Sequence, residues 1–251
     1  MNIKMIVTDL DGTLLRKNKT ISEYSASVFR RCKENGIKTV YATARPIRAV
    51  EKWLNLPVSF DASVYHNGAV IDLYGEKTLR YGISQKEVKE ILSLAIGKKI
   101  CIEINDSLYG NFDPSDIWQG IEIILTDFTD LPESSADKII LPMASLEELQ
   151  NVASILPDNL YIEMSENTVG MIMNKKATKA EAIKHLVNHY GLSLSDVAAF
   201  GDDYNDIEML RECGVGVAVA NALDEVKAAA DYICDTNDND GIAKWIEENI
   251  L

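Results

Sequence analysis

The chain has 251 residues, of which 47% are hydrophobic and 25% charged, and its formal net charge is −14. This length allows one large domain or two modest ones with enough chain for a buried core. Because an acidic surface repels nucleic acid and anionic membranes, we expect neither as a partner. No apolar run of the sequence approaches the roughly 20 residues that span a bilayer, and the N-terminus carries no signal peptide, so we expect a cytoplasmic location.

The four cysteines are far apart in the sequence and form no Cys-x-x-Cys pair. They are predicted to be reduced, mostly buried thiols, and neither a zinc site nor a disulfide framework is expected.

The first predicted element is a short buried strand at residues 3–7, and two carboxylates follow it in Asp9-Leu10-Asp11-Gly12-Thr13. Residues i and i+2 of an extended chain project to the same side, so Asp9 and Asp11 are expected to face one point. Two carboxylates that close repel each other unless a cation or a shared proton compensates. An Asp-Gly pair on its own is also a common turn.

Helix and strand then alternate, which predicts a parallel sheet with crossover helices. The predicted elements are a helix at 22–35, a strand at 38–42, a helix at 47–54, a strand at 63–65, a turn at Asn67-Gly68 and an apolar return at 69–73.

After Tyr81 the pattern changes to short strands with two helices, which indicates a separate α+β unit at residues 83–174 inserted into the first domain. Capping boxes at Ser84 with Glu87 and at Ser145 with Glu148 predict the starts of the two helices. They are expected to end near residues 96 and 155, and strands are predicted at 100–104, 120–125, 137–141, 160–165 and 168–173, with a turn at Glu166-Asn167.

The alternating pattern resumes with a third capping box, Thr178 with Glu181, so residues 1–82 and 175–251 are predicted to form one α/β core with a parallel sheet. The remaining predicted elements are a helix at 179–190, a strand at 197–200, a helix to Arg211, a strand at 215–219, a helix from Asn221, a strand at 232–233 and a helix from Gly241.

Polar clusters stand at or just beyond the carboxyl ends of the predicted strands, where ligands bind in parallel sheets. The clusters are Asp9 with Asp11, Thr43 with Arg45, Lys179, and Asp202 with Asp206. Carboxylate oxygens suit Mg²⁺, and Thr, Arg and Lys side chains suit the remaining oxygens of a phosphate. A lysine in the first turn of a helix opposes the helix dipole, which favours an anion bound at that terminus.

Other polar and aromatic residues have simpler interpretations. Asp203 is interpreted as a surface turn residue, and Asn205 as a turn residue or a helix N-cap. His66 and Trp118 are interpreted as structural, the latter as a packed aromatic of the inserted unit.

These segments together resemble the four motifs of the haloacid dehalogenase (HAD) superfamily, in the same order and with similar spacing. The matching segments are Asp9 to Thr13, Thr43-x-Arg45, Lys179, and Gly201-Asp202-Asp203-Tyr204-Asn205-Asp206. The insertion between the second and third motifs and the segment Lys179-Ala180-x-Ala182 resemble its Cof-like (type IIB cap) phosphatase branch, although that branch usually has glycine where Ala180 stands. The resemblance implies a Rossmann-like HAD core with an inserted α+β cap.

The resemblance also implies roles for the two N-terminal aspartates and for Mg²⁺. Asp9 would be the nucleophile that forms an aspartyl-phosphate, and Asp11 the general acid and then the base, with a raised pKa expected for Asp11. Asp9, the backbone carbonyl of Asp11 and Asp202 would ligate the metal, and Asp206 would do so directly or through water.

The other implied roles concern the phosphate ester. Thr43 and Lys179 would hold the phosphoryl oxygens with help from Asn205, and Arg45 would reach the substrate.

The expected function is therefore Mg²⁺-dependent hydrolysis of a small phosphomonoester by a monomer or homodimer. Sugar phosphates, phosphoglycolate, pyridoxal phosphate and flavin mononucleotide all fit this branch. A phosphomutase and a non-catalytic phosphate-binding protein stay open as alternatives. A signalling receiver domain does not fit, because its phosphorylated aspartate ends the third strand, and a transporting ATPase needs membrane spans.

Overall fold

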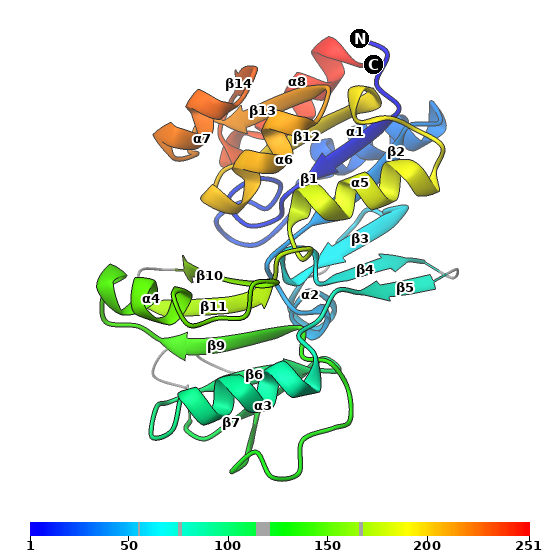
Figure 1. The fold of residues 1–251 in the computed structure, drawn as a ribbon. Coiled ribbons are helices and arrows are strands. Elements are labelled where there is room, and N and C mark those ends of the chain that lie inside the picture. Colours follow the sequence, from blue (N-terminus) through cyan, green and yellow to red (C-terminus); the bar gives the residue numbers. More distant parts are fainter. Residues whose placement is uncertain (55, 75–76, 114–120, 166–167) are drawn as a thin grey trace. The chain divides into compact units, whose positions relative to one another are not determined.

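The structure is a computed structural model, and it describes residues 1–54, 56–74, 77–113, 121–165 and 168–251. Trp118 and the predicted turn at residues 166–167 lie outside this part. The chain divides into two compact units: unit 1 comprises Met1–Leu79 and Thr178–Leu251, and unit 2 comprises Arg80–Ala177 (Figure 1). No helix in the described part of the chain combines the length and the apolar character needed to cross a membrane.

Within the described residues, unit 1 is built on one eight-stranded sheet. Its strands are β1 (Met5–Thr8), β2 (Lys38–Ala42), β3 (Ala62–Tyr65), β4 (Val70–Leu73), β5 (Lys77–Arg80), β12 (Val197–Gly201), β13 (Val215–Val219) and β14 (Tyr232–Cys234). Their order is β14-β13-β12-β1-β2-β3-β4-β5, and β1 pairs in parallel with both β2 and β12. The predicted parallel sheet is thus confirmed; β4 returns antiparallel to β3.

Helices cover this sheet in two groups, as expected for strands that are buried on both faces. The helices are α1 (Glu23–Glu34), α2 (Ile47–Trp53), α5 (Lys179–His189), α6 (Ile207–Glu212), α7 (Asp224–Ala229) and α8 (Gly241–Asn249). Helices α1 and α8 contact each other and form one group, and α6 contacts both α5 and α7 to form the other. The two groups lie on opposite faces of the sheet (Figure 1). All four residues of β1 are buried between them.

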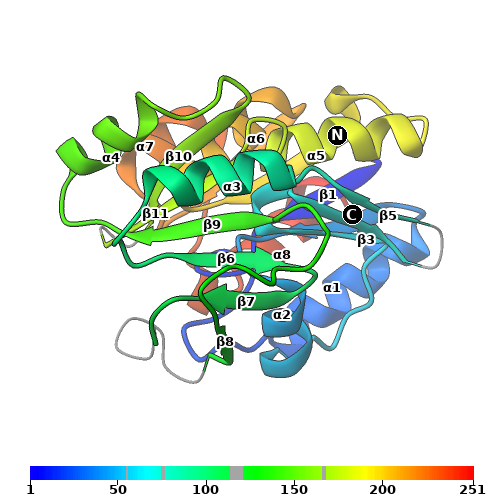
Figure 2. The ribbon, with the colours of Figure 1, turned by 60° about the horizontal axis from the view of Figure 1, so that its bottom comes forward.

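Unit 2 is a six-stranded sheet with two helices, again within the described residues. Its elements are α3 (Gln85–Leu94), β6 (Cys101–Ile104), β7 (Ser107–Gly110), β8 (Ile123–Leu125), β9 (Lys138–Pro142), α4 (Leu146–Ala153), β10 (Leu160–Ser165) and β11 (Val169–Asn174). The strand order is β10-β11-β9-β6-β7-β8, and α3 and α4 lie on one face of the sheet (Figure 2). Ser84 caps α3 with the predicted reciprocal bonds to Glu87.

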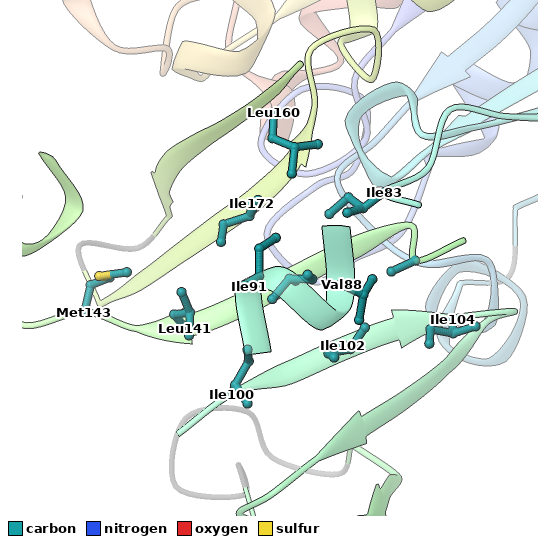
Figure 3. Close-up of a cluster of buried hydrophobic side chains, with 12 residues drawn as sticks. Ile83, Val88, Ile91, Ile100, Ile102, Ile104, Leu141, Met143, Leu160 and Ile172 are labelled. Carbon is teal, nitrogen blue, oxygen red and sulfur yellow. The ribbon is translucent and has the colours of Figure 1, made fainter. Parts of the chain in front are cut away.

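The core of unit 2 fills the space between its helices and its sheet. Val88 and Ile91 of α3 point toward Ile102, Leu141 and Ile172 on the strands (Figure 3). The alternation of apolar residues along β6 places Ile102 and Ile104 on this face. These contacts bury the face of the sheet that the helices cover, and a second buried cluster contains the alternate strand residues Cys101, Leu108, Ile140 and Val169.

Strands β5 and β7 were not predicted from the sequence. Asn105 and Asp106 both adopt positive φ angles, 51° and 61°, between β6 and β7. A two-residue turn of this kind matches the twist of a hairpin, and Asn and Asp tolerate it better than most residues.

Candidate active site

The segment after β1 turns back immediately: Asp9 directly follows the last residue of the strand, Thr8, and Gly12 adopts a left-handed conformation. The Asp9 N–H continues the sheet by donating to the carbonyl of Phe200 at 3.0 Å, and the Leu15 N–H closes a turn onto the carbonyl of Leu10 at 2.7 Å. Gly12 has a φ of 79°, and a Cβ there would lie 2.3 Å from Oδ2 of Asp202. Only glycine meets both requirements.

Register in the sheet aligns the ends of three neighbouring strands. Thr8 of β1 pairs with Tyr41 of β2 and with Phe200 of β12. The residues that follow each strand therefore leave the sheet at the same edge: Asp9 after β1, Thr43 after β2 and Asp202 after β12.

A buried ammonium joins two carboxylates at this edge. Lys179 Nζ lies 2.7 Å from Oδ1 of Asp9 and 2.7 Å from Oδ1 of Asp206, and the Lys179 side chain is 1% exposed. Thr178 caps the helix that begins with Lys179 by accepting a hydrogen bond from the N–H of Glu181. Burial lowers the pKa of Lys179, but the two carboxylates outweigh it and the pKa is raised, so the side chain is a fixed positive charge.

Asp206 is fully buried, and each of its oxygens already accepts hydrogen bonds. Oδ2 accepts from the backbone N–H groups of Asp202 and Asp203 at 3.0 and 3.1 Å, and Oδ1 accepts from Lys179. A Cβ at Gly201 would lie 2.4 Å from Cβ of Asp206, so glycine is required for this approach. Asp206 therefore fixes the loop that carries Asp202.

Three carboxylates converge, and together they form a site that fits a hard cation. One oxygen from each of Asp9, Asp202 and Asp206 lies within 4.8 Å of the others. Burial raises the pKa of Asp9 well above its usual range, and the neighbouring carboxylates raise it further against the opposing Lys179. Burial likewise raises the pKa of Asp202 to about 6, although Thr13 donates a hydrogen bond to this carboxylate. A divalent cation with a preference for oxygen ligands would relieve this repulsion.

Asp11 is held away from this buried cluster by two cations. Arg45 donates to Oδ2 from Nε at 2.5 Å and to Oδ1 from Nη2 at 2.8 Å, and Lys19 donates to Oδ1 at 2.7 Å. Burial raises the pKa of Asp11, but these hydrogen bonds outweigh it and hold the pKa below its usual range. The raised pKa expected for Asp11 is therefore wrong for this arrangement, because a bidentate guanidinium and an ammonium stabilise the ionised form.

Thr43 and Asn205 occupy the same end of unit 1. Thr43 is buried, and its hydroxyl accepts a hydrogen bond from the N–H of Arg45 at 3.2 Å. Asn205 lies in the short turn that contains Asp206, and its amide donates to Oδ1 of Asn67 at 2.9 Å. Oδ1 of Asn205 is buried and has no hydrogen-bond partner among the described residues.

Three side chains with contacts to these residues were not assigned a role by the sequence analysis: Thr13, Lys19 and Asn67. Thr13 lies inside the recognised motif, so its contact with Asp202 could have been expected. Asn67 was interpreted only as part of a turn, and nothing in the sequence around Lys19 indicated a contact with Asp11.

Comparison with known proteins agrees with this geometry. Residues 6–246 match the family of haloacid dehalogenase-like hydrolases. A 5-amino-6-(5-phospho-D-ribitylamino)uracil phosphatase of Bacillus subtilis is 29% identical over 265 residues, which cover 97% of this chain and 96% of the relative.

Two solved structures extend the comparison. A HAD-superfamily phosphatase from Bacteroides thetaiotaomicron superimposes with a TM-score of 0.87 at 25% identity, covering 98% of this chain and 94% of that one. A sugar phosphatase of HAD subclass IIB gives a TM-score of 0.83 at 26% identity and covers 98% of both chains.

The protein thus belongs to the haloacid dehalogenase-like hydrolases. Within that family it is a phosphatase, with subclass IIB phosphatases among its structural neighbours.

Proposed function

We propose that this phosphatase hydrolyses phosphate monoesters of sugars or sugar alcohols with Mg²⁺ as cofactor. The reaction proceeds through an aspartyl-phosphate formed on Asp9. The observation that supports this most directly is the convergence of three carboxylates around the Lys179 ammonium. A phosphate dianion and a carboxylate nucleophile repel each other. Catalysis therefore needs positive charge at the point where they meet.

Asp9, Asp202 and the backbone carbonyl of Asp11 would hold the metal. Asp206 would contribute through water, because its carboxylate already accepts three N–H donors. When bound, Mg²⁺ supplies charge neutralisation to the transferred phosphoryl group and favours the ionised form of Asp9. The raised pKa of Asp9 supports the need for such a cation.

In the first step, a carboxylate oxygen of Asp9 forms a bond to phosphorus while the ester P–O bond breaks. Asp11 takes up a proton from solvent before the ester P–O bond breaks and gives that proton to the departing alcohol oxygen. The Lys179 ammonium binds a non-bridging oxygen, with Thr43 and Asn205 beside it. Covalent catalysis of this kind divides one difficult displacement into two easier ones.

In the second step, water attacks phosphorus and the bond from phosphorus to the Asp9 oxygen breaks, which releases inorganic phosphate. Asp11 now takes the proton of the attacking water. Its ionised form is the one that the structure holds with Arg45 and Lys19, which suits the base role. We propose that Arg45, which binds Asp11, also reaches the substrate.

The substrate class is supported by the named relatives. One acts on a phosphorylated ribitylamino compound and one on a sugar phosphate. Both are phosphate esters of polyhydroxylated chains, and we propose the same class here. We further propose that residues 83–174, as the inserted cap, select among such esters.

Phosphate release from a panel of esters, measured with Mg²⁺ and with excess chelator, tests this function. We expect hydrolysis of sugar and sugar-alcohol phosphates that is lost in chelator and restored by Mg²⁺. Full activity in chelator would contradict the metal role, and hydrolysis restricted to other ester classes would contradict the substrate class. Exchange of residues 83–174 for the equivalent segment of a relative should change the preferred ester without changing the metal requirement.

A further inference from the structure

The turn that follows β3 has an unusual backbone conformation. His66, Asn67 and Gly68 have φ angles of 49°, 57° and 120°, so three consecutive residues lie in the left-handed region. Glycine enters this region freely, whereas other residues do so at a cost that is lowest for residues such as asparagine. All three residues are buried. A buried turn with this conformation persists only where surrounding contacts hold it in place.

The backbone of this turn is bonded to the segment that follows β2. The His66 N–H donates to the carbonyl of Arg45 at 3.1 Å. The Asn67 N–H donates to the carbonyl of Thr43 at 3.0 Å, and the Thr43 N–H donates to the carbonyl of Val64 in β3 at 2.9 Å. The hydrogen bonds between β2 and β3 thus continue beyond the sheet, and they bring the turn to the edge at which Thr43 lies.

The same turn lies against the helix that carries Lys179. A Cβ at Gly68 would lie 2.3 Å from the carbonyl oxygen of Thr178, the N-cap of α5, so only glycine permits this approach. Lys179 is the first residue of that helix. The turn therefore contacts two of the segments to which we assign the binding of the phosphoryl group, those of Thr43 and Lys179.

The side chain of Asn67 contacts a third such segment. Its Oδ1 accepts a hydrogen bond from Nδ2 of Asn205 at 2.9 Å. Nδ2 carries two N–H groups, so this bond leaves one of them for another acceptor. Asn205 directly precedes Asp206, whose carboxylate bonds the Lys179 ammonium at 2.7 Å. The amide therefore belongs to the loop that contacts this ammonium.

The bond to Asn67 defines which end of the Asn205 amide faces the turn. Oδ1 of Asn205 is buried and has no hydrogen-bond partner in the described part of the chain, so the contacts described there hold this side chain through its nitrogen. If the amide were reversed, its oxygen would face Oδ1 of Asn67, and two acceptors repel each other. In the orientation that Asn67 selects, Asn205 has a free donor, which is the group that a phosphate oxygen requires.

We propose that Asn67 is a positioning residue for Asn205, which keeps the free N–H of the Asn205 amide available to a non-bridging oxygen of the phosphoryl group. This inference rests on the phosphate-binding role proposed for Asn205 above. The turn after β3 thereby joins the segments of Thr43, Lys179 and Asn205, and the placement of all three donors depends on it. Asn67 itself needs no contact with the substrate.

The test measures the affinity for inorganic phosphate in the presence of Mg²⁺ by isothermal titration calorimetry. Asn67→Gly removes the amide and suits the left-handed backbone, so the fold should be kept. Asn35→Gly is the matched control, because Asn35 is an exposed residue at the end of α1, before the amino end of β2. We expect Asn205→Ala to weaken phosphate binding about tenfold and Asn67→Gly about fivefold, as for the loss and the loosening of one hydrogen bond to an anion. Asn35→Gly should bind phosphate as the parent protein does.

A second substitution at the same position separates the amide from the backbone. Asn67→Ala removes the same side-chain amide but disfavours the φ of 57°, so it should unfold at a lower urea concentration than Asn67→Gly. Its phosphate affinity should nevertheless equal that of Asn67→Gly. Normal phosphate binding by Asn67→Gly together with weak binding by Asn67→Ala would show that only the backbone matters and would overturn the inference.

The double variant shows whether Asn67 acts through Asn205. Adding Asn67→Gly to Asn205→Ala should cause no further loss of phosphate affinity, since the amide that Asn67 orients is already absent. A further fivefold loss would refute positioning through Asn205. If Asn205→Ala alone binds phosphate as tightly as the parent protein, the phosphate-binding role of Asn205 is refuted and the role of Asn67 with it. A parent protein that binds no phosphate in Mg²⁺ would contradict the proposed function and the inference that rests on it.

Discussion

Replacement of Asp202 by asparagine should stabilise the metal-free protein although it removes a residue of the proposed active site. Burial and the neighbouring carboxylate of Asp206 raise the pKa of Asp202 from 3.8 to about 6. At about 1.4 kcal/mol for each pH unit, this difference corresponds to about 3 kcal/mol of destabilisation when the carboxylate is ionised. Asparagine has no charge and its oxygen can still accept the hydrogen bond from Thr13, so we expect a gain of about 1–3 kcal/mol.

The sign of the pH dependence follows from the raised pKa. Between about pH 4 and pH 6 the folded protein binds a proton at Asp202 that the unfolded chain has already released, so stability falls as pH rises through this window. Below this pH window, the free energies of unfolding of the wild type and of Asp202→Asn should be similar. Above it, the variant should be more stable by the full gain of about 1–3 kcal/mol.

Urea denaturation at pH 4.5 and pH 7.5, each in chelator and in Mg²⁺, measures these differences. Asp203→Asn is the matched control, since Asp203 is the exposed neighbour and asparagine keeps its capping function. Mg²⁺ should stabilise the wild type and the control by mass action but not Asp202→Asn. Destabilisation of Asp202→Asn at pH 7.5 in chelator, or an equal gain at both pH values, would refute the electrostatic reasoning.

Three further variants test the contacts of single residues. Lys179→Met leaves two buried carboxylates without their shared cation, so it should cost about 3–5 kcal/mol in urea denaturation and abolish turnover; a fully stable variant would contradict this. Gly12→Ala places a methyl group against Asp202 at a φ of 79°, so it should weaken Mg²⁺-induced stabilisation in thermal shift assays, and an unchanged shift would refute the packing argument. Arg80→Met removes the partner of the fully buried Asp137. The free energy of opening measured by amide hydrogen exchange in unit 2 should therefore fall by about 3 kcal/mol. An unchanged exchange rate would show that the charge of Asp137 is compensated elsewhere.

Sequence patterns predicted the architecture of unit 1 because most of its elements follow local rules. Strand β2 begins and ends at the predicted residues, and α1 begins directly after its Ser22 cap. The apolar runs of β1 and β12 predict buried strands, and parallel neighbours place their carboxyl ends at one edge. The short strands β5 and β7 were missed, because four residues with mixed polarity carry little periodicity.

The contacts of individual side chains were less accessible to prediction. Lys179 and Asp206 are separated by 27 residues; their place beyond the ends of predicted strands and the resemblance to a known family both put them in one site, but neither predicted that the ammonium bonds the Asp206 carboxylate. The lowered pKa of Asp11 depends on its hydrogen bonds from Arg45 and from Lys19, and no glycine or asparagine in the sequence predicts the left-handed backbone of Lys19. The Asn205–Asn67 bond likewise depends on how two loops meet, which no local pattern encodes.

The central claim is that Asp9 carries the phosphoryl group, and trapping that group tests it most directly. The enzyme with Mg²⁺ and a hydrolysed sugar phosphate is quenched in acid within one turnover, digested and analysed by mass spectrometry. We predict a phosphoryl adduct on Asp9, which is lost from Asp9→Asn together with turnover and is retained by Asp203→Asn. An adduct on a different residue, or turnover by Asp9→Asn at a rate comparable to that of the parent enzyme, would contradict the account.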